Sequence, residues 1–338
     1  MTRVLLKILS VQDGHLYMTR HSFVFQSGSG PFLSRSFTVL ALGSVMLGTV
    51  AAAPSWAKDP FGRDKPIGDA TEKVFRAVFD EGNYKKAEGL LPAAEKADPD
   101  EPLLYALKAS LLFAQSSKQD DTSKGDTDGF AKAAIRTQET AKKLMDKDKP
   151  RGQLYLAVGN FLESAHIIAT KGIVQGTPDA LGKLTNAFQA LGESEKLAPN
   201  DPEFNLLKGS MDLMLAINVN LPLSDSGAAI ARIEGIKQPK YVADRILAWG
   251  FRDMKQQDKA LAAVDRALSS SPSENPELYY LKGQILVQQN KKSESVQWFQ
   301  KALAKKDYLT PSLIGQFCYD LRGADPSVAA KTPGCPAN

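Results

Sequence analysis

The most constraining feature of the sequence is a pattern that repeats within residues 241–303. Small residues recur there in two sets, 35 residues apart: Ala248, Ala260 and Ala267, then Gly283, Ser295 and Ala302. Large residues shift with them, because Phe251 and Val264 correspond to Leu286 and Phe299. Small side chains let two helices approach closely, and bulky neighbours fill the groove between them. The pattern therefore predicts two helix pairs stacked side by side in a repeat array.

A second recurrence extends the array toward the N-terminus. The phrase Pro-x-x-x-x-Leu-Lys-(Ala/Gly) begins at Pro102, at Pro202 and at Pro276. Proline is favoured in the first turn of a helix, so each phrase predicts a helix start. No stretch rich in β-forming residues interrupts the helical pattern. We therefore predict an all-α fold, a solenoid of about six helix pairs.

Three of the predicted pairs are interrupted. In the second pair, residues 116–129 form an insertion and the next helix begins at Phe130. A longer insertion lies around residues 170–178 in the third pair, and residues 218–227 of the fourth are irregular. Asp120, Asp121, Asp126 and Asp128 crowd the first insertion without the terminal Glu of a calcium loop, which favours a solvated loop. Inserted hairpin loops are thus part of the predicted fold.

Residues 1–57 have the pattern of a secretory signal peptide. The uncharged run 37–53 follows Arg35, and Ser55-Trp56-Ala57 offers small residues at the two positions that signal peptidase reads. Cleavage is expected between Ala57 and Lys58, with Met18 as an alternative start. An uncleaved anchor helix is the other interpretation, since 17 uncharged residues are near the lower limit for a membrane span. Membrane association is expected only if the leader is retained.

Removal of the leader changes the charge of the chain. Residues 1–57 contain four Lys/Arg and one Asp, so the rest keeps 38 basic and 37 acidic residues. Without a basic stripe, nucleic acid is not an expected partner. The predicted location is the periplasm or cell envelope.

The C-terminal part contains the two cysteines of the chain. Residues 58–67 are predicted as an extended lead-in, 68–311 as the repeat array, and 312–338 as a capping helix and tail. In an exported protein the pair Cys318 and Cys335 predicts a disulfide that holds the tail on the cap. Two free thiols or an intermolecular bridge are the alternatives.

The spacing and residue types resemble those of the tetratricopeptide repeat family over residues 67–311. With its export leader and insertions, the chain also resembles exported tetratricopeptide proteins of photosynthetic bacteria. The resemblance implies a right-handed superhelix whose first helices line a concave groove. It also implies that a protein or peptide partner binds in that groove.

Family positions transferred to this sequence give the candidate partner-binding residues. They are Arg245, Trp249, Arg252 and Asp253, then Tyr280, Gln284 and Gln288, and in the third pair Gln153, Asn160 and Glu163. Trp249 lies opposite the small contact residues, where it either binds a partner or packs on neighbouring structure. The basic and Asn pair of the family's chaperone-tail clamp is missing from all six pairs.

Catalytic signals are sparse. The leader holds His15 and His21, which leaves His166 as the one His in the remainder, and beside two isoleucines it is interpreted as a packed helix residue. No phosphate loop or nucleophile elbow occurs, and no metal or cofactor is predicted. The sequence thus predicts an exported, non-enzymatic scaffold. The alternative is an envelope enzyme or accessory subunit with a site in the groove.

Overall fold

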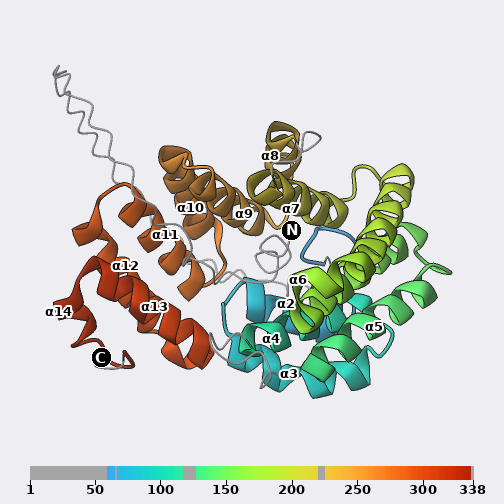
Figure 1. Cartoon of the computed structure of the whole chain (residues 1–338), viewed down its shortest axis with the longest axis horizontal. Coiled ribbons are helices and arrows are strands. Elements are labelled where there is room, and N and C mark those ends of the chain that lie inside the picture. The colour runs from blue at the N-terminus through green and yellow to red at the C-terminus, as the bar shows by residue number, and fades with distance from the viewer. Residues whose placement is uncertain (1–58, 65–66, 117–126, 220–224, 336–338) are drawn as a thin grey trace, which may run out of the picture.

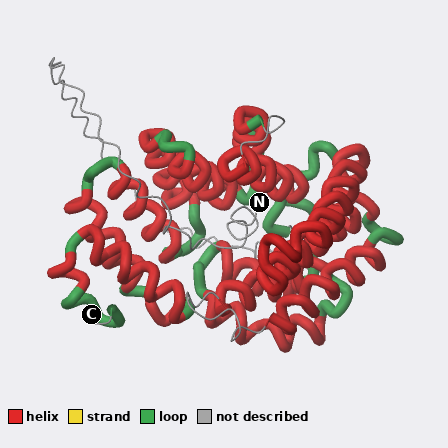
Figure 2. Tube along the Cα trace, in the orientation of Figure 1, coloured by secondary structure: helices red, strands yellow, loops and turns green. Residues whose placement is uncertain are grey.

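Consecutive helices pack against one another in pairs, as Figures 1 and 2 show. The structure is a computed structural model that describes residues 59–64, 67–116, 127–219 and 225–335. The predicted leader and residues 117–126 of the first insertion lie outside these described residues. The first three pairs are α2 (Asp69–Phe79) with α3 (Tyr84–Ala97), α4 (Pro102–Ser116) with α5 (Thr127–Leu144), and α6 (Lys149–Leu197).

The remaining helices continue the same arrangement. They are α7 (Pro202–Val219) with α8 (Ser226–Glu234), α9 (Lys240–Asp253) with α10 (Gln257–Ser270), α11 (Pro276–Gln288) with α12 (Lys292–Leu303), then η1 (Lys306–Tyr308), α13 (Pro311–Ala324) and α14 (Pro326–Ala329). The described ranges contain helices and loops and no strand (Figure 2). The all-α solenoid of about six pairs is confirmed.

The small residues occupy the contacts for which the sequence pattern predicted them. The side chains of Ala248, Ala260, Ala267, Ser295 and Ala302 are completely buried. At Gly283 an added Cβ would lie 2.6 Å from the ring of Phe299, so no larger residue fits without movement. Close helix approach, inferred from the 35-residue recurrence, is therefore correct.

The third pair departs from its prediction. A straight helix of 49 residues would be about 74 Å long. Yet Ser194 Oγ donates to the carbonyl oxygen of Pro150 at 2.9 Å, and Ser164 Oγ to that of Ala180 at 3.1 Å. Helix α6 therefore folds back on itself, with Lys171 and Asp179 paired at the reversal. The predicted hairpin is present, but the insertion around residues 170–178 is not a separate loop.

Two other irregular segments are shorter than predicted. Helix α5 begins at Thr127 rather than at Phe130. Helix α7 continues to Val219, and α8 begins at Ser226, where Asp225 accepts hydrogen bonds from the first free amides. Residues 218–219 and 226–227 of the stretch predicted to be irregular are therefore helical, and residues 220–224 lie outside the described residues.

The lead-in is a turn and not an extended strand-like segment. The amide of Asp59 donates to the carbonyl oxygen of Arg63 at 2.8 Å, and that of Gly62 to Asp59 at 2.9 Å. Gly62 has φ +80°, a conformation that favours glycine. Phe61 and Ile67 are buried, so this segment is part of the folded array.

The capping helix that the sequence predicted is present at the C-terminal end. Leu313, Phe317 and Leu321 of α13 are buried against the last repeat. A disulfide joins Cys318 in α13 to Cys335, which fastens the tail that carries the short helix α14. Sequence patterns had not predicted α14.

The array curves until its ends meet. Helix α13 contacts α4, and η1 contacts α3 (Figure 1). The turn after α2 is also bonded to the last two pairs: Ser273 Oγ donates to Asp80 O at 2.6 Å, and Asn275 Nδ2 donates to Phe79 O at 2.9 Å. The Tyr241 hydroxyl donates to the carboxylate of Asp80. The solenoid is therefore a closed ring, in which the first pair touches the fifth and sixth.

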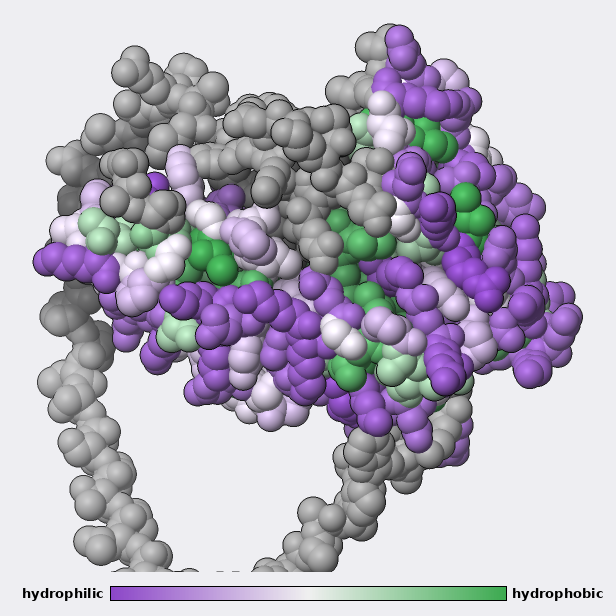
Figure 3. Space-filling view, turned by 90° about the horizontal axis from the view of Figure 1, so that it is seen from below, coloured by the Kyte–Doolittle hydropathy of each residue, from purple (hydrophilic) through white to green (hydrophobic). Residues whose placement is uncertain are grey.

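The surface around the ring is mixed. Figure 3 shows a face on which most described residues are hydrophilic and the hydrophobic ones form small clusters. No helix in the described ranges has the length and apolar character that crossing a membrane would need.

Candidate partner-binding site

The predicted groove residues of the last two pairs lie on α9 and α11. These helices are nearer to the middle of the ring than α10 and α12 (Figure 1). The residues fall into two groups with different surroundings. One group is covered by the chain itself, and the other lies on the C-terminal halves of the two helices.

Arg245 belongs to the covered group. It forms an ion pair with Glu277, whose side chain is 1% exposed, and Glu277 also accepts a hydrogen bond from the hydroxyl of Tyr84 in α3. Burial lowers the pKa of Arg245, but the charge of Glu277 more than offsets this, so the pKa is raised and the guanidinium stays charged. Burial and Glu277 both raise the pKa of Tyr84, which keeps its proton. In this structure Arg245 holds the ring closed.

Tyr280 is covered as well. Its ring stacks on Phe317 of the cap with centroids 3.9 Å apart, and its side chain is 1% exposed. Its hydroxyl donates to Asp320 at 2.5 Å. Burial and the negative charge of Asp320 raise its pKa well above the usual range. Tyr280 thus joins the last repeat to α13.

The second group surrounds the C-terminal ends of α9 and α11. Arg252 donates to the side-chain oxygen of Gln284 and forms an ion pair with Asp253 at 2.9 Å. Gln288 is exposed and accepts a hydrogen bond from Gln257 at 2.8 Å. These contacts join three of the predicted residues, Arg252, Asp253 and Gln284, and Gln288 follows Gln284 by one turn of α11.

Trp249 lies one turn before Arg252 on α9. It is half-buried and packs against the hydrophobic core. One part of the indole therefore contacts the protein interior, as the packing alternative expected, while the remainder is open to contact.

The candidates of the third pair do not join this group. The side-chain amide of Asn160 donates to the carbonyl oxygen of Leu156 at 2.8 Å, and Asn160 is 5% exposed. Glu163 accepts from Gln138 and pairs with Lys183, both at 2.7 Å, and so bridges α5 and the second half of α6. Gln153 is half-buried. Asn160 and Glu163 therefore serve helix packing, Asn160 within α6 and Glu163 between α5 and the two halves of α6.

A buried ionic cluster was not anticipated from the sequence. Arg151, 3% exposed, pairs with Glu101 at 2.7 Å and with Glu203 at 3.0 Å. Glu203 also accepts a hydrogen bond from Tyr155 and an ion pair from Arg63 at 2.7 Å. One sequence signal for this cluster was present. A glutamate follows the proline in the phrases that begin at Pro202 and Pro276, and both Glu203 and Glu277 are buried hydrogen-bond acceptors.

The protonation of this cluster follows from its charges. Burial raises the pKa of Glu203, but the attraction of Arg151 and Arg63 is stronger and holds it below its usual value. Burial raises the pKa of Glu101 by more than Arg151 and the amide of Leu103 lower it, so the pKa of Glu101 is raised. Glu203 is thus the carboxylate with which both Arg151 and Arg63 form ion pairs.

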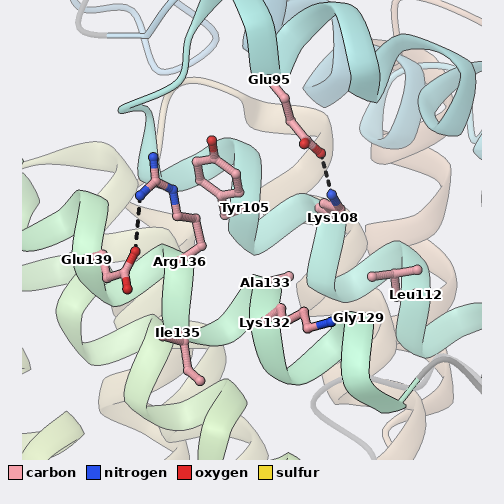
Figure 4. Close-up of a pocket in the computed structure, with 10 residues that line it drawn as sticks. All are labelled: Glu95, Tyr105, Lys108, Leu112, Gly129, Lys132, Ala133, Ile135, Arg136 and Glu139. Atoms are coloured by element: carbon pink, nitrogen blue, oxygen red, sulfur yellow. Dashed lines mark hydrogen bonds and ion pairs between the residues drawn. The ribbon is translucent and has the colours of Figure 1, made fainter.

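A surface pocket of about 610 Å³ lies between α3, α4 and α5 (Figure 4). Lys108 pairs with Glu95 at 2.5 Å on one side, and Arg136 pairs with Glu139 at 3.1 Å on the other. Arg136 also covers the ring of Tyr105, with 5.4 Å from its Cζ to the ring centroid. With Lys108 and Arg136 already paired to carboxylates, the pocket provides a mixed polar surface.

The residues that could hold a metal are few. Within the described ranges, no group of three or more His, Cys, Asp or Glu is placed to bind a metal ion. His166 packs near Phe130, 5.9 Å between ring centroids, and burial lowers its pKa. It is the packed helix residue that the sequence predicted.

The stacked helix pairs define a helical-repeat solenoid. A family model described as tetratricopeptide repeat matches residues 247–309, from within α9 to the end of η1. Residues 247–309, which belong to the fifth and sixth pairs, are therefore tetratricopeptide repeats. Comparison with curated proteins gave no significant match. Repeats of this family support a role as a protein-interaction scaffold.

Proposed function

We propose that the protein is an exported, non-enzymatic scaffold that binds a protein or peptide partner. The proposed contact surface is formed by the C-terminal halves of α9 and α11, with Trp249, Arg252, Asp253, Gln284 and Gln288. The observation that carries the proposal is the clustering of these side chains on the matched repeats.

The chemistry of the surface suits peptide recognition. Tryptophan and arginine are the residues that most often dominate binding energy at interfaces. Arg252 and Asp253 supply one charge of each sign, and the exposed side-chain amide of Gln288 can donate to a peptide backbone. The amide of Gln284 is bonded to Arg252, Tyr280 and Asp320 and helps to hold Arg252 in place. Tyr280 and Asn160 are buried, and Arg245 pairs with the buried carboxylate of Glu277, so these three residues, which the family positions also implicated, are left out of this surface. The side chains of Arg252 and Asp253 pair with each other and are 12% exposed.

The test compares two tryptophan variants in partner capture from an envelope extract. Trp249→Ala removes the proposed contact, and Trp298→Ala is the matched control, because Trp298 lies on the outer helix α12 between Lys282 and Lys301. We expect Trp249→Ala to lose the captured protein and to keep a nearly unchanged melting temperature. Equal capture by both variants would contradict the surface. A large drop in melting temperature would show that Trp249 serves packing.

The export part of the proposal has its own measurement. N-terminal sequencing of the protein recovered from the cell envelope should begin at Lys58. A protein that retains residues 37–53 would favour the anchored alternative.

A further inference from the structure

The turn over residues 59–64 is a compact unit with its own internal bonds. The carboxylate of Asp59 accepts from the amides of Phe61 at 3.0 Å and Arg63 at 2.8 Å, and from Nε of Arg63 at 2.9 Å. Asp59 is 4% exposed although it is charged. The turn therefore keeps its shape through contacts among its own residues, and it presents two side chains outward, Phe61 and Arg63.

These two side chains are received by helices that are distant in sequence. Arg63 reaches Asp201 at 3.0 Å and Glu203 at 2.7 Å, more than 130 residues along the chain. Phe61 packs edge-on against Phe75 of α2, with ring centroids 5.6 Å apart. In Figure 1 the turn, drawn in blue, lies inside the ring near α6 and α7.

The fit between the turn and its surroundings is close at Gly62. A Cβ added there would lie 2.2 Å from the side-chain oxygen of Gln238, in the loop before α9. The turn thus touches α2, the start of α7 and the loop that leads to α9. It spans the interior of the ring and contacts its first, fourth and fifth pairs.

The site that receives Arg63 requires a cation. Without the turn, the carboxylates of Glu101, Asp201 and Glu203 would face a single guanidinium, that of Arg151. With the turn in place Glu203 is 0% exposed and Glu101 is 9% exposed, so Arg63 supplies a charge that water does not supply in the closed site. A planar guanidinium can bond two carboxylates at once, as Arg63 does with Asp201 and Glu203.

We propose that the inner face of the ring is a receptor for an arginine-bearing turn, and that residues 59–64 are its tethered ligand. A partner segment of the same chemistry, with an aromatic residue and an arginine separated by glycine, would bind by displacing the turn. The receptor consists of Asp201, Glu203 and Phe75. It is separate from the surface proposed on α9 and α11.

A labelled peptide that copies residues 58–65 provides the probe. In the native protein the tethered turn competes with the peptide for the site. A site that is free for only a fraction of the time binds its ligand with an apparent affinity reduced in proportion to that fraction. The variant Arg63→Ala should therefore bind the peptide at least about tenfold more tightly than the native protein does. A peptide with alanine in place of arginine should not bind. The control Arg136→Ala, which alters a surface arginine of α5, should behave like the native protein.

A second measurement covers the case in which Arg63→Ala fails to fold. Hydrogen exchange of the native protein should become faster at the amides of Phe61 and Arg63 when the peptide is in excess, because the turn is displaced. Unchanged exchange, or a folded Arg63→Ala variant that does not bind the peptide, would overturn the proposal and leave the turn as a structural element. Adding Trp249→Ala should not alter peptide binding, so this result is independent of the partner surface on α9.

Discussion

Substitution of Gly283 by alanine tests the close helix contact from which the repeat assignment began. Gly283 lies in α11, and a Cβ there would meet three ring atoms of Phe299 at 2.6, 2.7 and 3.0 Å. Carbon atoms in ordinary contact are about 3.5–4.0 Å apart, so the shortfall is close to an ångström. Phe299 is completely buried, with its ring 5.8 Å from that of Tyr280, and it has little room to retreat.

Two opposing effects set the size of the change. Alanine is favoured over glycine inside a helix by about 0.8–1.0 kcal/mol. Overpacking a filled core costs about 1–3 kcal/mol. Gly89 in α3 isolates the first effect, because an added Cβ there has no atom within 4 Å. Gly89→Ala should therefore stabilise the protein, and Gly283→Ala should be less stable than Gly89→Ala by about 1–3 kcal/mol.

Urea denaturation followed by far-UV circular dichroism measures both variants against the native protein. The dependence of the unfolding free energy on urea should be the same for all three, so that midpoints can be compared directly. Combining Gly283→Ala with Phe299→Leu should cost less than the two changes added together, since the leucine makes room for the methyl group. If Gly283→Ala stabilises as much as Gly89→Ala, the close contact between α11 and α12 is incorrect.

Two further predictions concern the cap and the pH response. Reduction of the Cys318–Cys335 disulfide, which closes 17 residues, should lower the unfolding free energy by at most about 3 kcal/mol, measured by denaturation with and without reductant. Burial lowers the pKa of His166 from its ordinary 6.5, so the stability linked to it is complete above pH 6.5 and is lost as the pH falls through the folded-state value. His166→Gln should flatten this part of the stability–pH curve, and an unchanged curve would contradict the assignment.

The periodic features of the fold could be predicted because they are local. Ala260 and Gly283 mark close helix contacts in the fifth and the sixth pair, respectively. The helix starts at Pro102, Pro202 and Pro276 can be predicted from the residues of the first helical turn alone. Such signals depend on residues a few positions apart. The cap was predictable for the same reason, since its apolar stripe repeats with the helical period.

The reversal within α6 was placed correctly but given the wrong form. The sequence of residues 170–178 contains two glycines, two threonines and Pro178, which are typical of a loop. The chain instead turns there within the element α6, and Ser164 and Ala180 meet across the bend at 3.1 Å. Tertiary contact between the two halves decided this conformation, and residue propensities gave no sign of it.

The site was harder to predict, since its contacts depend on ring closure. Family positions identify side chains that point inward from each first helix, and Arg245 and Tyr280 do so. Each is nonetheless engaged within the chain. Arg245 pairs with Glu277, which also accepts a hydrogen bond from Tyr84, and Tyr280 donates to Asp320. No pattern within a single repeat shows that the first pair returns to the fifth and sixth.

Closure of the ring also changes how the protein should unfold. In an open solenoid each repeat touches only its neighbours, so the ends can unravel one repeat at a time. Here the bonds of Asp80 and Phe79 to Tyr241, Ser273 and Asn275 link residues 161 to 196 positions apart. Unfolding of either end of the array therefore removes contacts from the opposite end. Formation of these contacts requires distant parts of the chain to meet, which slows folding. A single cooperative transition is expected, in which terminal and central pairs lose protection from hydrogen exchange together.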